Sequence, residues 1–247
     1  MQCKLCGMSR RLVKAHIVPK AFWVTMRDGA VAPVLATNTP GHFSRKAPIG
    51  VYDATILCVL CEAKFQAVDD YGVEVLLKRF NYYFTPIEEG GLVRAYESSK
   101  VDQMRLTRFV VAIAWRASVS SQPFFSKVSL CALEQSAGEV STDPTIPVPS
   151  QFGVCLSRWR TSADNDGAAD AMLDPVPEQI GGINCLRFYL GRTLAWLRID
   201  ALPFRPPLNR LELCSQPKAV VVARDFGKSR DLAAMVNVLR SGGAPAP

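Results

Sequence analysis

Two pairs of cysteines limit the possible folds of this chain more than any other feature. Cys3 and Cys6 form one C-x2-C motif, and Cys58 and Cys61 form a second, with residues 7–57 between them. Each motif suits a tight turn that directs both sulfurs at one ion, and two pairs complete the tetrahedral thiolate set that structural zinc prefers. We therefore expect a structural Zn²⁺ site. The alternatives are merely reduced thiols and a redox pair, which is disfavoured because neither motif lies in a βαβ pattern.

The composition is that of a globular protein that does not enter a membrane. Of the 247 residues, 49% are hydrophobic, but the longest purely apolar run, residues 109–115, is far too short to cross a bilayer. No apolar segment follows the N-terminal charges, so we expect no secretory signal and a cytoplasmic location. Cysteines are reduced in that compartment. We therefore expect the four cysteines outside the two motifs to be small core residues, namely Cys131, Cys155, Cys185 and Cys214.

The positive charge of the chain lies near its N-terminus. Residues 1–50 carry eight Lys or Arg against one acid, whereas residues 51–100 carry five against eight. A basic segment beside an acidic one suits a site that holds a polyanion on one side and a cation on the other. The alternative is solubility alone. The bases expected to contact nucleic-acid phosphates, without reading base sequence, are Arg10, Arg11, Lys14, Lys20, Arg45 and Lys46.

Hydrophobic periodicity and turn residues predict the local structure. We expect a strand over residues 11–19, a long loop over 21–50, a helix over 57–67, a second helix capped by Asp69 or Asp70, a break over 85–91, a helix over 103–120 and a last helix near 231–239. Four strands are expected over residues 152–159, 183–190, 193–199 and 219–225, the middle two forming a hairpin at Gly191-Arg192. We interpret Trp115 as a core residue, Arg116 as a cation at the rim of the core, and His42 as an exposed loop residue.

The first 75 residues resemble a known family. The cysteine motifs, together with "KAHIVPKAF" and "GVYDATILCVLCEAKF", resemble the HNH, or ββα-metal, endonucleases built on a treble-clef zinc scaffold. The resemblance implies that His16, before I-x-P, is the general base. Asp53 stands at the family's central asparagine and Glu62 at its last histidine, and both substitutions keep oxygen ligands suited to Mg²⁺ or Mn²⁺. Ala15 stands where many members carry a metal-binding acid or histidine.

The resemblance also implies a fold and a function. The expected α+β fold has a treble-clef zinc domain over residues 1–95 and a mixed domain over 96–247, with helices and a small antiparallel sheet. The expected function is metal-dependent hydrolysis of DNA phosphodiesters, in phage defence or mobile-element biology. His16 would take a proton from the attacking water, while a divalent cation on Glu62 and Asp53 would stabilise the phosphate charge.

Other interpretations stay open at this point. His16 could be a packing residue bonded to a backbone carbonyl, Glu62 could complement the positive end of a helix, and Asp53 could cap a turn. The N-terminal region could be a non-catalytic zinc module that binds nucleic acid or a partner protein. Residues 96–247 could also carry an unrelated function.

Overall fold

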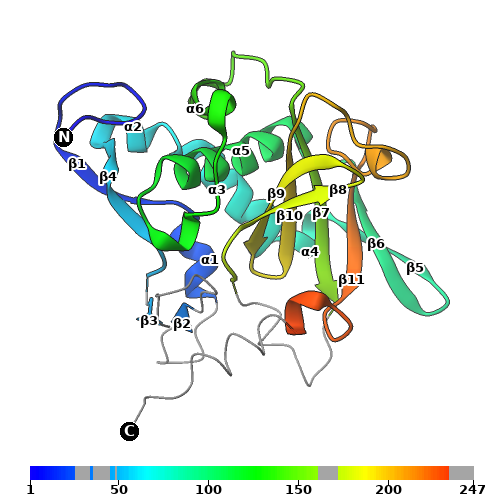
Figure 1. Cartoon of the computed structure of the whole chain (residues 1–247). Helices are drawn as coiled ribbons and strands as arrows, with labels where there is room; N and C mark the ends of the chain where they lie inside the picture. The colour runs from blue at the N-terminus through cyan, green and yellow to red at the C-terminus, as the bar shows by residue number, and fades with distance from the viewer. Residues whose placement is uncertain (26–33, 36–44, 48, 161–171, 234–247) are drawn as a thin grey trace, which may run out of the picture.

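A long central helix separates the two parts of this α+β fold. The computed structural model describes residues 1–25, 34–35, 45–47, 49–160 and 172–233. Helix α5 (Gln103–Val119) lies between a seven-stranded sheet on one side and an N-terminal hairpin of β1 (Leu12–His16) and β4 (Tyr52–Cys58) on the other (Figure 1). None of the helices in these ranges is both long and apolar enough to cross a membrane.

Short elements connect the hairpin to the sheet. The helices before and after α5 are α1 (Lys20–Val24), α2 (Val59–Ala63), α3 (Gln66–Val73), the π-helical turn η1 (Glu74–Lys78), α4 (Phe80–Tyr83), the 3₁₀ turns η2 (Pro123–Phe125) and η3 (Cys131–Leu133), α6 (Glu134–Thr142) and the 3₁₀ turn η6 (Leu208–Arg210). A second small sheet pairs β2 (Val34–Leu35) with β3 (Arg45–Lys46).

The seven-stranded sheet is larger than the small antiparallel sheet that we predicted. Its order is β5-β6-β11-β7-β10-β9-β8, and every pair is antiparallel except β11 with β7. The strands are β5 (Thr85–Glu89), β6 (Leu92–Ser98), β7 (Phe152–Arg160), β8 (Val176–Ile180), β9 (Ile183–Leu190), β10 (Thr193–Ile199) and β11 (Ala219–Asp225). The predicted break over residues 85–91 is wrong because Gly90 and Gly91, both at positive φ, close a hairpin there. The predicted boundary between residues 95 and 96 therefore falls inside β6.

Helix α5 is the centre of one continuous apolar core. Asp102 caps the helix by accepting a hydrogen bond from the Arg105 backbone N–H, and every residue from Phe109 to Ala117 is buried. The core continues from Cys3 near the N-terminus to Val221 in β11. The two faces of the sheet differ in whether their apolar residues join this continuous core. The face toward α5 belongs to the continuous core, whereas the apolar residues of the opposite face form two separate clusters.

Several sequence predictions are confirmed and others are wrong. The helix over 103–120, the four late strands and the Gly191-Arg192 hairpin are confirmed. The strand predicted over residues 11–19 is confirmed in its central part, as β1 ends at His16. The helix over 57–67 is wrong at its start, because β4 continues through Cys58. Helix α3 begins at Gln66, so Asp69 and Asp70 lie inside it and do not cap it.

The four scattered cysteines divide into two groups. Cys155 and Cys185 are buried as predicted, and burial raises the pKa of each thiol to about 12. Cys131 and Cys214 are exposed and have positive φ, so their prediction as core residues is wrong. His42 and most of the predicted last helix lie outside the residues that the structure describes.

Candidate metal centre and neighbouring polar cluster

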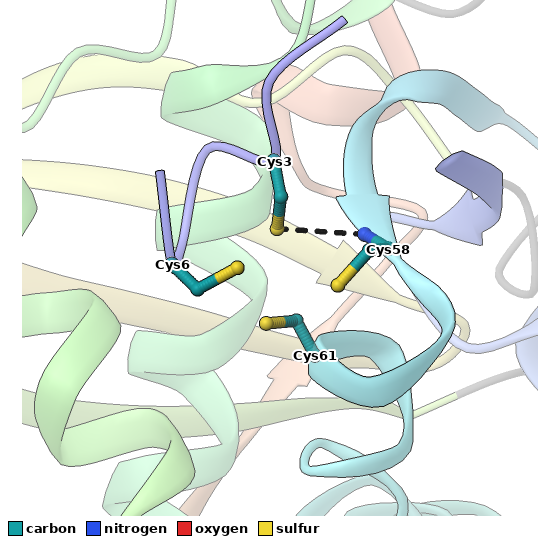
Figure 2. A group of neighbouring side chains, drawn as sticks. All are labelled: Cys3, Cys6, Cys58 and Cys61. Carbon is teal, nitrogen blue, oxygen red and sulfur yellow. Dashed lines mark hydrogen bonds between the residues drawn. The ribbon is translucent and has the colours of Figure 1, made fainter. Parts of the chain in front are cut away.

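The fold brings the two cysteine motifs together. A turn at the N-terminus, in which the Gly7 N–H donates to the Cys3 carbonyl over 2.9 Å, directs the sulfurs of Cys3 and Cys6 inward. Cys58 ends β4 and Cys61 lies in α2, so the strand-to-helix junction supplies the other pair. Figure 2 shows all four side chains pointing toward one another, and their Sγ atoms all lie within 4.8 Å of one another.

The spacing of the sulfurs fits a tetrahedral ion. Zinc–sulfur bonds of about 2.3 Å require sulfurs about 3.8 Å apart, which the cluster satisfies with small adjustments. The Cys58 backbone N–H donates to the Cys3 Sγ over 3.4 Å, which stabilises a thiolate at that position (Figure 2). This four-cysteine group could therefore hold a metal such as zinc.

The proton affinities of the sulfurs support the same conclusion. Burial raises the pKa of Cys3, but hydrogen bonds from the backbone of Cys6, Cys58 and Leu5 outweigh it and lower the pKa to about 6. Burial raises the pKa of Cys61, and the neighbouring sulfurs raise it further. A thiolate at Cys3 thus disfavours ionisation of Cys61. A divalent cation would offset the repulsion between the negative sulfurs, which is why such clusters release protons when they bind metal.

The hairpin does not bring His16 and Asp53 to the same face. Ala15 pairs with Asp53 across β1 and β4, and His16 pairs with Tyr52. Paired residues of antiparallel strands point to the same side and successive residues to opposite sides. His16 therefore shares a face with Tyr52, whose ring centroid lies 6.0 Å from that of the imidazole. The Asp53 side chain points to the other face, toward the end of α5.

Asp53 is held by hydrogen bonds on that face. Its Oδ1 accepts from the Thr55 backbone N–H and hydroxyl, and its Oδ2 accepts from the Ser120 hydroxyl and from both the N–H and the hydroxyl of Ser121. Burial opposes ionisation of this fully buried carboxyl, but these donors outweigh it and lower the pKa of Asp53. The hydrogen bonds of this carboxylate therefore link the hairpin to the C-terminal end of α5.

His16 is kept neutral and in one tautomer. Its Nε2 lies 3.0 Å from the Ile49 carbonyl oxygen, which can only accept a hydrogen bond. The neutral ring therefore carries its hydrogen on Nε2 and leaves Nδ1 as the proton acceptor. Burial lowers the pKa of His16, and the charges of Lys20 and Arg116 lower it further, against opposing effects of the Ile49 hydrogen bond and Asp69.

Glu62 lies beside a buried ion pair that the sequence predictions missed. Arg116 donates to both carboxylate oxygens of Asp69, over 2.6 and 2.7 Å, and its side chain is only 1% exposed. Arg116 is therefore a core residue, and its interpretation as a rim cation is wrong. Burial raises the pKa of Glu62, while Arg116 lowers it and Asp69 raises it. The same two charges also affect the pKa of His16.

One carboxylate oxygen of Glu62 has no hydrogen-bond partner. Its Oε2 is buried, and it accepts nothing from the protein within the part of the chain that the structure describes. A buried oxygen without a donor costs free energy, so this position suits a cation or a water molecule that the fold would hold there.

The predicted nucleic-acid contacts lie on the exposed side of the hairpin where they are described. Arg10, Arg11, Lys14 and Lys20 are exposed, and the Lys14 Nζ lies 5.2 Å from the Tyr52 ring centroid, on the face of His16. Arg45 and Lys46 form β3, but their side chains lie outside the described part of the structure. Of these bases, the structure places Lys14 on the same face of the hairpin as the imidazole.

Comparisons with protein-family models, curated proteins and solved structures gave no match. Fold and site therefore define the class only broadly. The chain is a mixed α+β protein with a seven-stranded sheet, a small hairpin and an N-terminal four-cysteine group that could hold a metal such as zinc.

Proposed function

We propose that this protein is a zinc-stabilised HNH-like nuclease that hydrolyses DNA phosphodiesters with a divalent cation. One observation carries the proposal. His16, the histidine at the family's general-base position, has a lowered pKa and a tautomer that leaves Nδ1 as an acceptor, on a surface that also exposes basic side chains. The treble-clef description of residues 1–75 belongs to this proposal, and the strand pair β1–β4 followed by α2 at the second cysteine motif supports it.

Each residue has a defined task in the proposed reaction. Arg10, Arg11, Lys14 and Lys20 hold the phosphate backbone. His16 accepts a proton at Nδ1 from the water that attacks phosphorus, and its Nε2–H to Ile49 keeps the ring oriented. Glu62 offers its unpartnered Oε2 as a ligand for Mg²⁺ or Mn²⁺, which when bound supplies electrostatic stabilisation of the phosphate. Asp53 takes no part, because its oxygens fasten the hairpin.

The direct test is nicking of supercoiled plasmid in Mg²⁺ or Mn²⁺. Wild-type protein is expected to convert plasmid to the nicked form, and His16→Ala to do so about 10²–10⁴-fold more slowly, as is usual when a general base is removed. His42→Ala, which removes the only other histidine of the chain, is the matched control and should act like wild type. Equal rates for the two variants would contradict the assignment of the base.

The pH dependence of nicking follows from the pKa of His16. A general base acts in its neutral form, and the pKa of His16 in the fold is below the usual 6.5. The nicking rate should therefore decline as pH is lowered, with a midpoint below pH 6.5. A midpoint above pH 7 would show that His16 is not the group that titrates. The measurement is the initial rate at saturating Mg²⁺, at pH values above the point where the cysteine site loses its metal.

A second candidate, a non-catalytic zinc module that binds nucleic acid, also has a specific observation in its favour. Ala15 supplies no ligand, and Asp53 is already used in hydrogen bonds, so Glu62 is the single family-position carboxylate left for a catalytic cation. Salt-dependent DNA binding by fluorescence anisotropy, with no nicking by wild type in either metal, would favour this candidate over the nuclease.

A further inference from the structure

The face of the seven-stranded sheet that points away from α5 contains a cavity of about 470 Å³. Its floor comes from β7, β10 and β11, and its walls come from β8, β9 and the segment before η6. The cavity lies beside two separate apolar clusters, one around Trp159 and Phe226 and the other around Ile183 and Phe204. Small-molecule sites usually have volumes of about 300–1,000 Å³, so its size suits a ligand of this kind.

Two donors in this cavity lack hydrogen-bond partners within the part of the chain that the structure describes. Ser157 is 2% exposed, and its Oγ is buried without a partner. The Nη1 of Arg224 is also buried without a partner, and within the described residues no carboxylate lies close enough to form an ion pair with this guanidinium. The Arg224 Cζ instead lies 4.8 Å from the ring centroid of Trp159 and 5.2 Å from that of Trp196. The aromatic rings hold the guanidinium without using its N–H groups.

The two acids near Arg224, Glu178 and Asp231, make their direct contacts with other groups, although the Oδ2 of Asp231 is buried without a hydrogen-bond partner among the described residues. Glu178 accepts from the Trp196 Nε1 over 2.9 Å and lies 3.6 Å from the Arg187 Nε. Asp231 lies 3.3 Å from the Arg187 Nη2 and accepts from the Tyr189 hydroxyl over 2.7 Å. Two guanidiniums thus lie near two carboxylates, and Glu178 itself lines the cavity. Within the described residues Arg224 is the guanidinium of the two that has no ion pair with either acid, and its Nη1 is buried without an acceptor. A buried N–H without an acceptor is costly, and an anionic acceptor from outside would remove that cost.

We propose that this cavity binds a small molecule with a compact anionic group, a carboxylate or a phosphate, attached to a flat apolar body. Arg224 forms the ion pair with the anionic group, and the Ser157 hydroxyl donates a hydrogen bond to it. Trp196, Phe204 and Leu208 line the apolar part of the cavity and contact the body of the ligand. The proposal concerns the far side of the sheet from the cysteine cluster, and it does not depend on the proposed nuclease function.

The test uses three naphthalene probes with the full-length protein. Binding of 2-naphthoate, 2-naphthyl phosphate and the neutral 2-naphthamide is measured by isothermal titration calorimetry. At least one anionic probe is expected to bind at least about tenfold more tightly than the amide, because a charge-assisted hydrogen bond contributes that much. The difference between the two anionic probes identifies the preferred anion. Equal binding of the amide, or no saturable binding of either anion, would overturn the proposal.

Variants locate the binding in the cavity. Arg224→Gln is expected to weaken the better anionic probe at least about tenfold, and Ser157→Ala about threefold to tenfold. Arg94→Gln is the matched control, because Arg94 is an exposed arginine of the same sheet that pairs with Glu89. If Arg224→Gln fails to fold, Ser157→Ala decides the question. Unchanged affinity in Ser157→Ala, and in Arg224→Gln where that variant folds, would place the probe elsewhere and reject the site.

Discussion

Cys58→Ser is expected to release the metal and to unfold the N-terminal hairpin. Purified wild-type protein should contain about one zinc per chain, and the variant should contain none. Four sulfurs from two distant motifs meet at this point, and the hydrogen bond from the Cys58 N–H to Cys3 is part of the same arrangement. Because a metal that binds only the folded state contributes its binding free energy to folding, we expect a fall in melting temperature of more than about 10 °C.

The measurements are metal content by mass spectrometry and thermal unfolding by circular dichroism. Cys131→Ser is the matched control, because Cys131 is exposed and lies outside the cluster. That variant should keep both its zinc and its melting temperature. A folded wild-type protein that carries no metal after purification without chelator would contradict the zinc site. Cys58→Ser with full zinc content would show that the remaining groups suffice and that the set of four ligands is wrong.

Asp69→Asn is expected to reduce the free energy of unfolding by about 3 kcal/mol or more. Arg116 is 1% exposed and gives both of its terminal N–H groups to Asp69, so the variant leaves a buried cation without its counter-charge. Removing one partner of a buried pair usually costs about 3–5 kcal/mol. The Asp69 side chain is 18% exposed, which favours the lower end of that range. Urea unfolding followed by tryptophan fluorescence measures the change.

Two further variants define the origin of this loss. Glu97→Gln breaks the Lys218–Glu97 pair, which is also short at 2.8 Å but exposed on both sides, and should cost less than about 1 kcal/mol. The double variant Asp69→Leu/Arg116→Met removes both charges and should recover most of the loss, since apolar replacements of a buried pair are often neutral. A loss in Asp69→Asn no larger than that in Glu97→Gln would show that the pair does not stabilise the fold.

Local sequence patterns were sufficient for elements whose signal is strong over a short range. The apolar spacing around Phe109 and Ile113 predicted α5, and the Gly191-Arg192 turn predicted the β9–β10 hairpin. The "EEGG" sequence before Leu92 carries the same kind of hairpin signal. The preceding strand β5 was nevertheless missed, because all five of its residues are exposed and its sequence shows no alternation of apolar and polar residues. A strand that buries little has a weak hydrophobic period.

The ion pair between Asp69 and Arg116 shows what local patterns leave open. Arg116 follows a long apolar run, and a charge in that context needs a partner when it is buried. The sequence therefore indicated that Arg116 needs an acidic partner. It did not indicate which acid, because several could pair with Arg116, and only the packing of α3 against α5 selects Asp69. The hydrogen bonds of Asp53 to α5 were not identifiable for a related reason, since Ser120 and Ser121 become its donors only where the hairpin reaches the end of α5.

By itself, the sequence determined which four cysteines come together, the central helix and the late strands of the sheet, because each depends on residues close together in the chain or on a chemical pattern with few alternatives. The tertiary structure alone decided that Asp53 accepts hydrogen bonds from Ser120 and Ser121, that one oxygen of Glu62 is buried without a partner among the described residues, and that Arg224 contacts tryptophan rings in a cavity. These outcomes depend on which donors and charges meet across long separations in the chain, and that information is absent from any local pattern.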